Sequence, residues 1–157
     1  MRKSALILLS LIIGTLSACA NTHVEKASMA VGEVSQEQLL TAHKSFQKGY
    51  QAVNLSAVDL ASVKTWPGNL HVDVYFGTWC HDSQREVPRF LKLVAESKNL
   101  SNRLIALDYQ KSEPSGSAIS HAIKYTPTFV VYQNDKEIGR IVERPKVSIA
   151  ADISAML

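Results

Sequence analysis

The chain has 157 residues, 46% of them hydrophobic and 20% charged, which suits one globular domain with a short extra segment rather than a disordered chain. Its formal net charge is +3, and without a leader carrying Arg2 and Lys3 the remaining 15 basic residues face 14 acidic ones. Because no basic run or stripe appears, this balance argues against nucleic acid or an acidic polymer as a partner. The two cysteines, Cys19 and Cys80, are too far apart for a zinc-type spacing.

Residues 1–18 have the pattern of an export signal peptide, in which a basic start is followed by an apolar run from Ala5 to Leu16. The run is shorter than the roughly 20 residues that span a bilayer, so a transmembrane helix is the weaker interpretation. The segment ends in Leu16-Ser17-Ala18-Cys19, which resembles the lipobox of bacterial lipoproteins. The resemblance implies cleavage before Cys19 and lipid on its sulfur and amino group. The alternative is an ordinary secretory signal.

A lipid on Cys19 would place the protein in the cell envelope, anchored to a membrane and facing the periplasm. In bacterial lipoproteins, the residue after the lipidated cysteine influences sorting between the two membranes. Here that residue is Ala20 and not Asp, which favours the outer membrane over the inner one. Residues 19–34 are polar and without period, and we interpret them as a tether to a domain at 35–157. The mature protein would then carry Cys80 as its one free thiol.

The domain is predicted to begin with a helix at 36–52, in which Ser35 is the N-cap and Gln38 completes a capping box. The stretch Ala57 to Trp66 is ambiguous, and we interpret it as a short edge strand before the turn Pro67-Gly68-Asn69. The remaining expected elements are strand 70–76, helix 80–97, strand 103–108, helix 117–124, strands 128–133 and 137–142, and helix 147–156. Alternation of strands and helices, followed by a hairpin, predicts an α/β sandwich of three layers around a mixed sheet.

The strand at 70–76 and the helix after it are joined by Gly77-Thr78-Trp79-Cys80. Pro88, eight residues after Cys80, falls inside the helix and should kink it. Thr126-Pro127-Thr128 begins 46 residues after Cys80 and precedes the hairpin. From about Trp66 to Leu157 this arrangement resembles the thioredoxin fold, and the Thr-Pro-Thr form is most similar to its extracytoplasmic, TlpA-like branch.

The resemblance assigns a role to each of four residues. Cys80 is the nucleophile, placed at a helix start where backbone N–H groups favour a thiolate over a thiol. Trp79 shields one side of it and offers a flat apolar contact. A cis peptide before Pro127 would turn the backbone of Thr126 toward the cysteine, where it can pair with an extended partner strand.

The sequence departs from the family pattern at three places: position 83, position 74, and the glycine after the last strand, which is replaced around Glu143-Arg144. Ser83 stands where a resolving cysteine is expected, so the chain cannot close a disulfide there by itself; its hydroxyl is expected to hydrogen-bond the Cys80 thiolate. The buried acid of thioredoxins is replaced by Val74, and Asp73 points to the other face of the strand because side chains alternate.

Three charged residues are possible modulators of the thiol. A protonated His81 would favour the thiolate and Asp82 would disfavour it, although an acid suits the first turn of a helix. Arg144, if it faces Cys80, would stabilise the thiolate and select carboxylate-bearing partners; a solvated surface arginine is the alternative.

The leading hypothesis is an envelope thiol-disulfide oxidoreductase that forms mixed disulfides through Cys80 with partner proteins or small thiols. Resolution would need an outside thiol, such as glutathione, a thioredoxin-like reductant or a second cysteine of the partner. The alternative is a non-catalytic thioredoxin-like module that binds or retains client proteins. A metal site of Cys80 with His81 or Met29 lacks a second soft ligand at a suitable spacing, so neither a metal nor another cofactor is expected.

Overall fold

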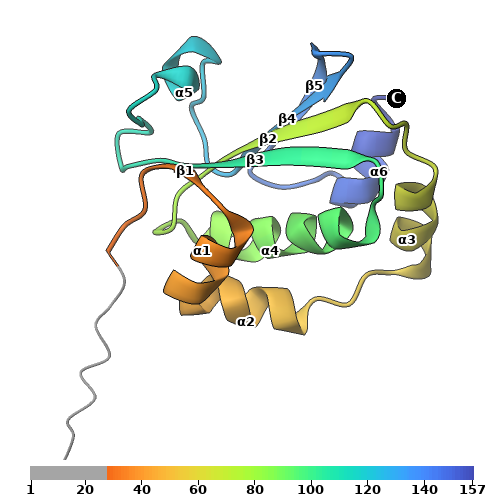
Figure 1. Cartoon of the computed structure of the whole chain (residues 1–157), viewed down its shortest axis with the longest axis horizontal. Coiled ribbons are helices and arrows are strands. Elements are labelled where there is room, and N and C mark those ends of the chain that lie inside the picture. The colour runs from red at the N-terminus through yellow and green to blue at the C-terminus, as the bar shows by residue number, and fades with distance from the viewer. Residues whose placement is uncertain (1–27) are drawn as a thin grey trace, which may run out of the picture.

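A computed structural model describes residues 28–157, and the predicted signal peptide and Cys19, the predicted lipidation site, lie outside this range. The described chain contains five strands and six helices in the α/β arrangement that the sequence predicts (Figure 1). The strands are β1 (Gly32–Val34), β2 (Leu70–Phe76), β3 (Leu100–Ala106), β4 (Thr128–Gln133) and β5 (Lys136–Val142). The helices are α1 (Gln36–Ala42), α2 (Lys44–Ala52), α3 (Ala57–Lys64), α4 (His81–Glu96), α5 (Ser117–Ser120) and α6 (Ile149–Ser154).

The five strands form one mixed sheet in the order β1-β3-β2-β4-β5. β2 and β3 are parallel and are joined through α4, whereas β1, β4 and β5 run antiparallel to their neighbours. β1 pairs with the end of β3, from Gly32 opposite Ala106 to Val34 opposite Leu104. The sheet therefore takes in the last residues of the segment predicted as a tether.

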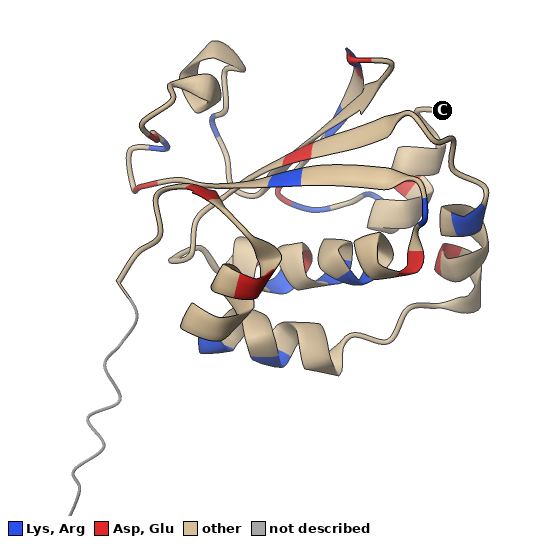
Figure 2. Cartoon of the chain, viewed as in Figure 1, with Lys and Arg blue, Asp and Glu red and all other residues tan. Residues whose placement is uncertain are grey.

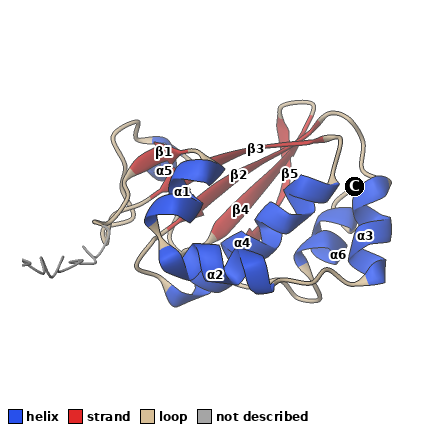
Figure 3. Ribbon diagram, turned by 60° about the horizontal axis from the view of Figure 1, so that its bottom comes forward, coloured by secondary structure: helices blue, strands red, loops and turns tan. Residues whose placement is uncertain are grey.

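The helices are distributed unequally over the two faces of the sheet. Figures 1 and 3 show α1, α2, α3, α4 and α6 on one side, where the main core is buried, and only α5 on the other. The second core lies under α5 and is small, comprising Tyr75, Ile105, Leu107, Ala118, Ile123 and Val130. Much of the second face is consequently free of a helical cover.

The stretch 57–66 is a helix, α3, so the predicted edge strand is wrong. Ser56 supplies the start signal that the strand interpretation overlooked: its hydroxyl oxygen accepts from the backbone N–H of Asp59 at 3.0 Å. Its own hydroxyl donates to the Asp59 carboxylate at 2.7 Å. This reciprocal cap satisfies a backbone N–H group at the start of the helix, and Val63 is buried on the helix. Both features favour a helix over a strand for this stretch.

The predicted helix 36–52 is divided in two at His43. The capping box of Ser35 and Gln38 is present as expected. His43 then adopts an extended backbone (φ −117°, ψ 96°), ending α1 and beginning α2. Leu39 and Phe46, on either side of this break, are both buried in the main core.

The boundaries of three other elements differ from those predicted. β3 begins at Leu100 rather than residue 103, because Leu100 to Ala106 pair continuously with β2. α5 ends at Ser120 and α6 spans Ile149–Ser154, so both helices are shorter than the sequence pattern indicates. Within residues 28–157, no helix combines the length and apolarity needed to cross a bilayer.

Pro88 lies inside α4 as predicted, and it determines how closely α2 approaches. A Cβ added at Gly49 of α2 would lie 3.0 Å from the Pro88 ring. Such a distance is tighter than an ordinary van der Waals contact, so the two helices pack closely only because residue 49 has no side chain. The contact holds α2 against the helix that begins at Cys80.

The loop before α5 is organised by the buried carboxylate of Glu113. It accepts hydrogen bonds from the backbone N–H groups of Ser115 at 2.5 Å and Ala118 at 3.1 Å. Burial alone would raise the pKa of Glu113, but these bonds and the hydroxyls of Ser115 and Ser117 outweigh it and lower the pKa to about 2.

This depressed pKa predicts an acid-sensitive contribution to stability. Since the pKa is lower in the folded chain, the carboxylate stabilises the fold above the unfolded pKa, and the contribution is lost as pH falls from about 5 to about 2. Glu113→Gln should therefore lower the free energy of unfolding by about 1–2 kcal/mol at pH 7 and much less near pH 2. Urea unfolding of both proteins across this range measures the difference, and an equal loss at every pH would contradict it.

Candidate functional site

Cys80 is the N-cap of α4 and stands just beyond the carboxyl end of β2. The turn before it is closed by a hydrogen bond from the Cys80 N–H to the Gly77 carbonyl oxygen at 3.0 Å. Its backbone is extended (φ −87°, ψ 125°), and the Gln84 N–H donates to its carbonyl oxygen at 3.0 Å. The side chain is half-buried and is the one cysteine thiol within residues 28–157. A nucleophile at this position has the free N–H groups of the first helical turn beside it.

The peptide before Pro127 is cis, as the resemblance to the thioredoxin fold implies, and it lies against Cys80. The thiol donates to the Thr126 carbonyl oxygen, with 3.1 Å between Sγ and oxygen. On the far side, the Glu143 N–H donates to the Pro127 carbonyl oxygen at 2.7 Å, which ties this loop to the end of β5. Thr126 and Cys80 are thus brought together although they are 46 residues apart in sequence.

Trp79 is fixed beside the cysteine by its indole, whose Nε1 donates to the Leu107 carbonyl oxygen at 3.1 Å. One face of the indole packs on Tyr109, with ring centroids 4.9 Å apart and planes inclined by 34°. Tyr109 itself is 62% exposed. Trp79, the residue before the cysteine, therefore forms an aromatic pair with Tyr109, and the two rings come from two different loops.

Ser83 is fully buried one helical turn after Cys80, but the hydrogen bond that the structure gives it goes elsewhere. Its hydroxyl oxygen accepts from the Gly77 N–H at 3.2 Å. Among residues 28–157, no hydrogen bond joins Ser83 to Cys80. The serine therefore stabilises the turn that precedes the cysteine.

Two of the charged residues expected to modulate the thiol, Asp82 and Arg144, pair with each other, and the structure gives neither a contact with the sulfur. The Asp82 carboxylate is held by Arg85 at 2.7 Å and by Arg144 at 3.2 Å, both measured to Oδ1. Arg144 is 68% exposed, and its ion pair with Asp82 links the segment after β5 to the first turn of α4. His81 is exposed. Two guanidinium groups thus offset the carboxylate that would otherwise oppose a thiolate.

The buried acid of the thioredoxin pattern is absent from the core face of β2, as predicted. Val74 is buried in the main core, and Asp73 lies on the opposite face, bonded to Arg103 and His71. Within residues 28–157, no group of three or more His, Cys, Asp or Glu side chains is arranged to hold a metal ion.

Three comparisons identify the kind of protein to which this site belongs. The family model described as Thioredoxin matches residues 29–154. The chain belongs to the thioredoxin family. It is 28% identical over 90 residues to thioredoxin H9 of Arabidopsis thaliana, which covers 57% of this chain and 61% of that protein, so the match spans about three fifths of the relative's length.

Solved structures share the thioredoxin fold at low sequence identity. A protein of unknown function from Pseudomonas aeruginosa has a TM-score of 0.55 and 16% identity, covering 78% of this chain and 84% of that one. An HIV epitope scaffold has a TM-score of 0.56, again with 16% identity, covering 78% of this chain and 85% of that one.

Sequence reasoning missed several residues that surround the cysteine of this thioredoxin-family protein. Tyr109, Tyr125 (54% exposed) and Val142 (44% exposed) lie on the loops or strand end that meet at Cys80. Ala30, before β1, donates its N–H to the Thr78 hydroxyl at 3.3 Å and so brings the N-terminal segment to the same loop. In the sequence, the signal for these residues was an aromatic side chain in each of two loops, Tyr109 and Tyr125. Which loops come together at the cysteine depends on the fold, so this signal alone could not identify them.

Proposed function

We propose that this thioredoxin-family chain acts through a single thiol, with Cys80 forming mixed disulfides with partner proteins or small thiols. The observation that carries the proposal is the position of Cys80: it begins α4, is half-buried, and faces the carbonyl of Thr126 before the cis proline. In this position a thiol is accessible, oriented and next to unpaired helix N–H groups.

The first step exchanges one disulfide for another. The Cys80 thiolate attacks one sulfur of a partner disulfide, the partner's S–S bond breaks, and its second sulfur leaves as a thiolate while the Cys80–partner disulfide forms. Cys80 gives up its proton to solvent, and the number of disulfides is unchanged. In this proposal the partner approaches the sulfur from the side of Thr126, and the aromatic pair of Trp79 and Tyr109 offers it an apolar contact.

The second step needs a thiol from outside the chain, because position 83 is a serine. A glutathione molecule, a thioredoxin-like reductant or another cysteine of the partner attacks the mixed disulfide and releases the Cys80 thiolate. The proposal places the protein in the cell envelope, held at the outer membrane by lipid on Cys19 and facing envelope proteins that carry cysteines or disulfides. Metabolic labelling with a palmitate analogue, lost in Cys19→Ala, tests the anchor.

Trapping of mixed disulfides tests the catalytic proposal. Envelope fractions quenched with acid and alkylated should contain disulfide-linked complexes of the full chain, and Cys80→Ala should abolish them completely because no sulfur remains to make the bond. Val58→Ala, which changes a 71% exposed residue of α3, is the matched control and should leave the complexes intact. Persistence of the complexes in Cys80→Ala would refute the proposed role of this thiol.

The second candidate function is a module that binds or retains clients without catalysis. It is favoured by the exposed aromatic surface of Tyr109 and Tyr125 beside a site that lacks a second thiol. This function predicts client binding that survives Cys80→Ala and is lost in Tyr109→Ala. Pull-downs under reducing conditions with both variants separate the two functions.

A further inference from the structure

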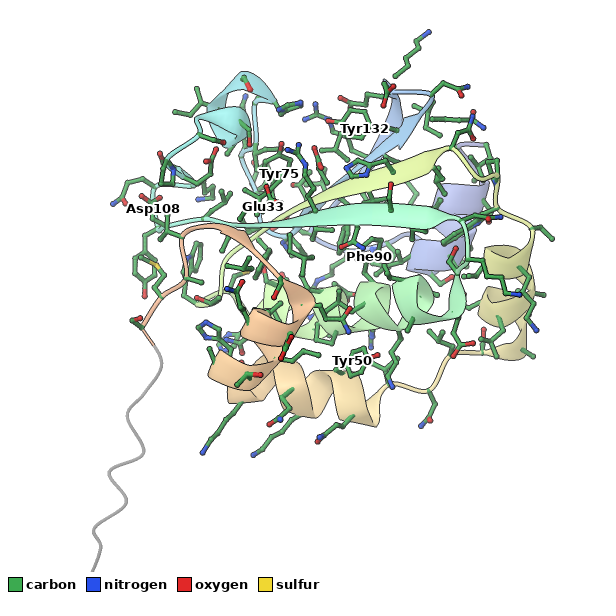
Figure 4. The ribbon with its side chains drawn as sticks, in the orientation of Figure 1. Glu33, Tyr50, Tyr75, Phe90, Asp108 and Tyr132 are labelled. Atoms are coloured by element: carbon green, nitrogen blue, oxygen red, sulfur yellow. The ribbon has the colours of Figure 1, made fainter. Side chains whose placement is uncertain are left out.

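A cluster of polar side chains occupies the sheet face that α5 leaves uncovered. In Figure 4, Tyr75 and Tyr132 lie on this side, and Phe90 lies among the helices on the other. Alternate residues of β2, β3 and β4 reach this face because side chains alternate along a strand. A cavity of about 290 Å³ opens there, lined by His71, Asp73, Arg103, His121, Tyr132 and Asp135.

The floor of the cavity is an ion pair on two neighbouring strands, β2 and β3, where Figure 2 shows an acidic and a basic position side by side. Asp73 is 2% exposed and accepts two hydrogen bonds from Arg103, at 2.8 and 2.7 Å, and one from His71 at 2.8 Å. Burial opposes ionisation of Asp73, but these bonds lower its pKa, so the carboxylate stays charged and fixed. The opposite nitrogen of His71 is bonded to Ser101 at 2.8 Å.

Above this floor, the hydroxyl of Tyr132 is buried and has no hydrogen-bond partner among residues 28–157. A buried polar atom without a partner is destabilising, and a ligand acceptor would supply the missing hydrogen bond. Burial, together with nearby Asp73, raises the pKa of Tyr132 to about 12, so the phenol remains a donor at neutral pH. The ring of His71 lies 6.1 Å from that of Tyr132, and the ring of His121 lies 6.4 Å away.

Other polar atoms that line the cavity also lack a hydrogen-bond partner, and they include both donors and acceptors. Nδ1 of His121 is bonded to the Ser117 carbonyl oxygen at 2.8 Å and so carries the proton, which leaves Nε2 as an acceptor. Within residues 28–157, neither this Nε2, nor Nη1 of Arg103, nor the carboxylate of Asp135 has a hydrogen-bond partner. The cavity therefore offers donors from Tyr132 and Arg103 and acceptors from His121 and Asp135.

The charge of the cavity restricts what can bind. Arg103 and Asp73 carry opposite charges and offset each other, and the carboxylate of Asp135 adds an acidic group to the lining. An anion would meet Asp135, and a cation would meet Arg103. A ligand that donates and accepts at adjacent atoms without net charge satisfies both halves, and the vicinal hydroxyls of a sugar do so.

We propose that this cavity is a binding site for an uncharged polyhydroxyl ligand, a sugar unit, held between the Tyr132 hydroxyl and Arg103 on one side and His121 and Asp135 on the other. The site lies on the sheet face opposite α4 and does not use Cys80. Its existence is therefore independent of the proposed thiol chemistry.

Amide NMR spectra of the full chain, titrated with glucose, mannose and N-acetylglucosamine, test the site. At least one sugar should shift the signals of residues 71, 73, 103, 121 and 132 in a saturable manner. Tyr132→Phe should weaken that binding about tenfold, the effect of one lost hydrogen bond, without lowering the melting temperature because the hydroxyl has no partner to lose. Tyr50→Phe, on the helical side of the sheet (Figure 4), is the matched control and should bind as the unaltered chain does.

Two results would overturn the proposal. One is the absence of saturable shifts with all three sugars, or equal binding by the Tyr132→Phe variant. The other is binding of acetate, phosphate or glycine at this face in place of the sugars, which would show that the site selects charge. Cys80→Ser should bind the sugar unchanged, so failure of the thiol proposal and failure of this one are told apart.

Discussion

Replacing Ser83 by cysteine should give the chain an intramolecular disulfide and a dithiol reductase activity at least about tenfold above its own. Ser83 lies in the helix one turn after the N-cap Cys80, a separation compatible with the distance that a disulfide requires between two Cα atoms. The new thiol would attack the mixed disulfide from within the chain, so that release no longer waits for an outside thiol. Reduction of insulin in the presence of dithiothreitol measures the gain, and mass spectrometry of the oxidised variant shows the loss of two hydrogens.

Ser83→Ala is the matched control for this gain. It removes the hydrogen bond from Gly77 to the Ser83 hydroxyl and should cost about 1 kcal/mol of stability, with no gain in reductase activity over the unaltered chain. If Ser83→Cys oxidises only between molecules, or gains no activity, then the two positions do not face each other as a redox pair. The low reductase activity of the unaltered chain would then have a cause other than the serine at position 83.

The elements that form the site could be predicted because their signals are local. The apolar run of β2, the cysteine at the start of α4 and the proline before β4 are each readable from a few consecutive residues. Ser35 and Gln38 likewise define the beginning of α1. The beginning of α3 carries a local signal of the same kind, the Ser56 cap on Asp59, so the strand predicted there contradicts a readable pattern.

What could not be predicted depends on strand order and on the convergence of loops. The pairing of β1 with β3 joins residues about 70 apart, and no sequence pattern specifies it. Asp73 and Arg103 meet because β2 and β3 are neighbours in register, and Tyr132 joins them because β4 lies on the other side of β2. The position of Arg144 could not be foreseen either, since it reaches Asp82 only because β5 forms the sheet edge beside β4 and ends near the start of α4.

Gly77→Ala should disturb both the fold and the thiol site, lowering the free energy of unfolding by about 2–3 kcal/mol. A Cβ at Gly77 would lie 2.6 Å from Cε2 and 2.8 Å from Nε1 of the Trp79 indole, distances that a real contact does not tolerate. The indole must move, and it would then give up its hydrogen bond to Leu107 and its packing on Tyr109. Urea unfolding gives the loss in stability, and near-ultraviolet circular dichroism reports the displaced indole.

Gly68→Ala separates this steric effect from the general cost of replacing a glycine, because nothing lies within 4 Å of a Cβ added there. It should change stability by less than about 0.5 kcal/mol and leave the aromatic spectrum unaltered. The half-buried Cys80 should also react faster with a bulky alkylating agent in Gly77→Ala, since we expect the displaced Trp79 to shield its sulfur less. Equal alkylation rates in Gly77→Ala, Gly68→Ala and the unaltered chain would mean that Trp79 does not limit access to the thiol, and Tyr109 would lose its role as the support of that shield.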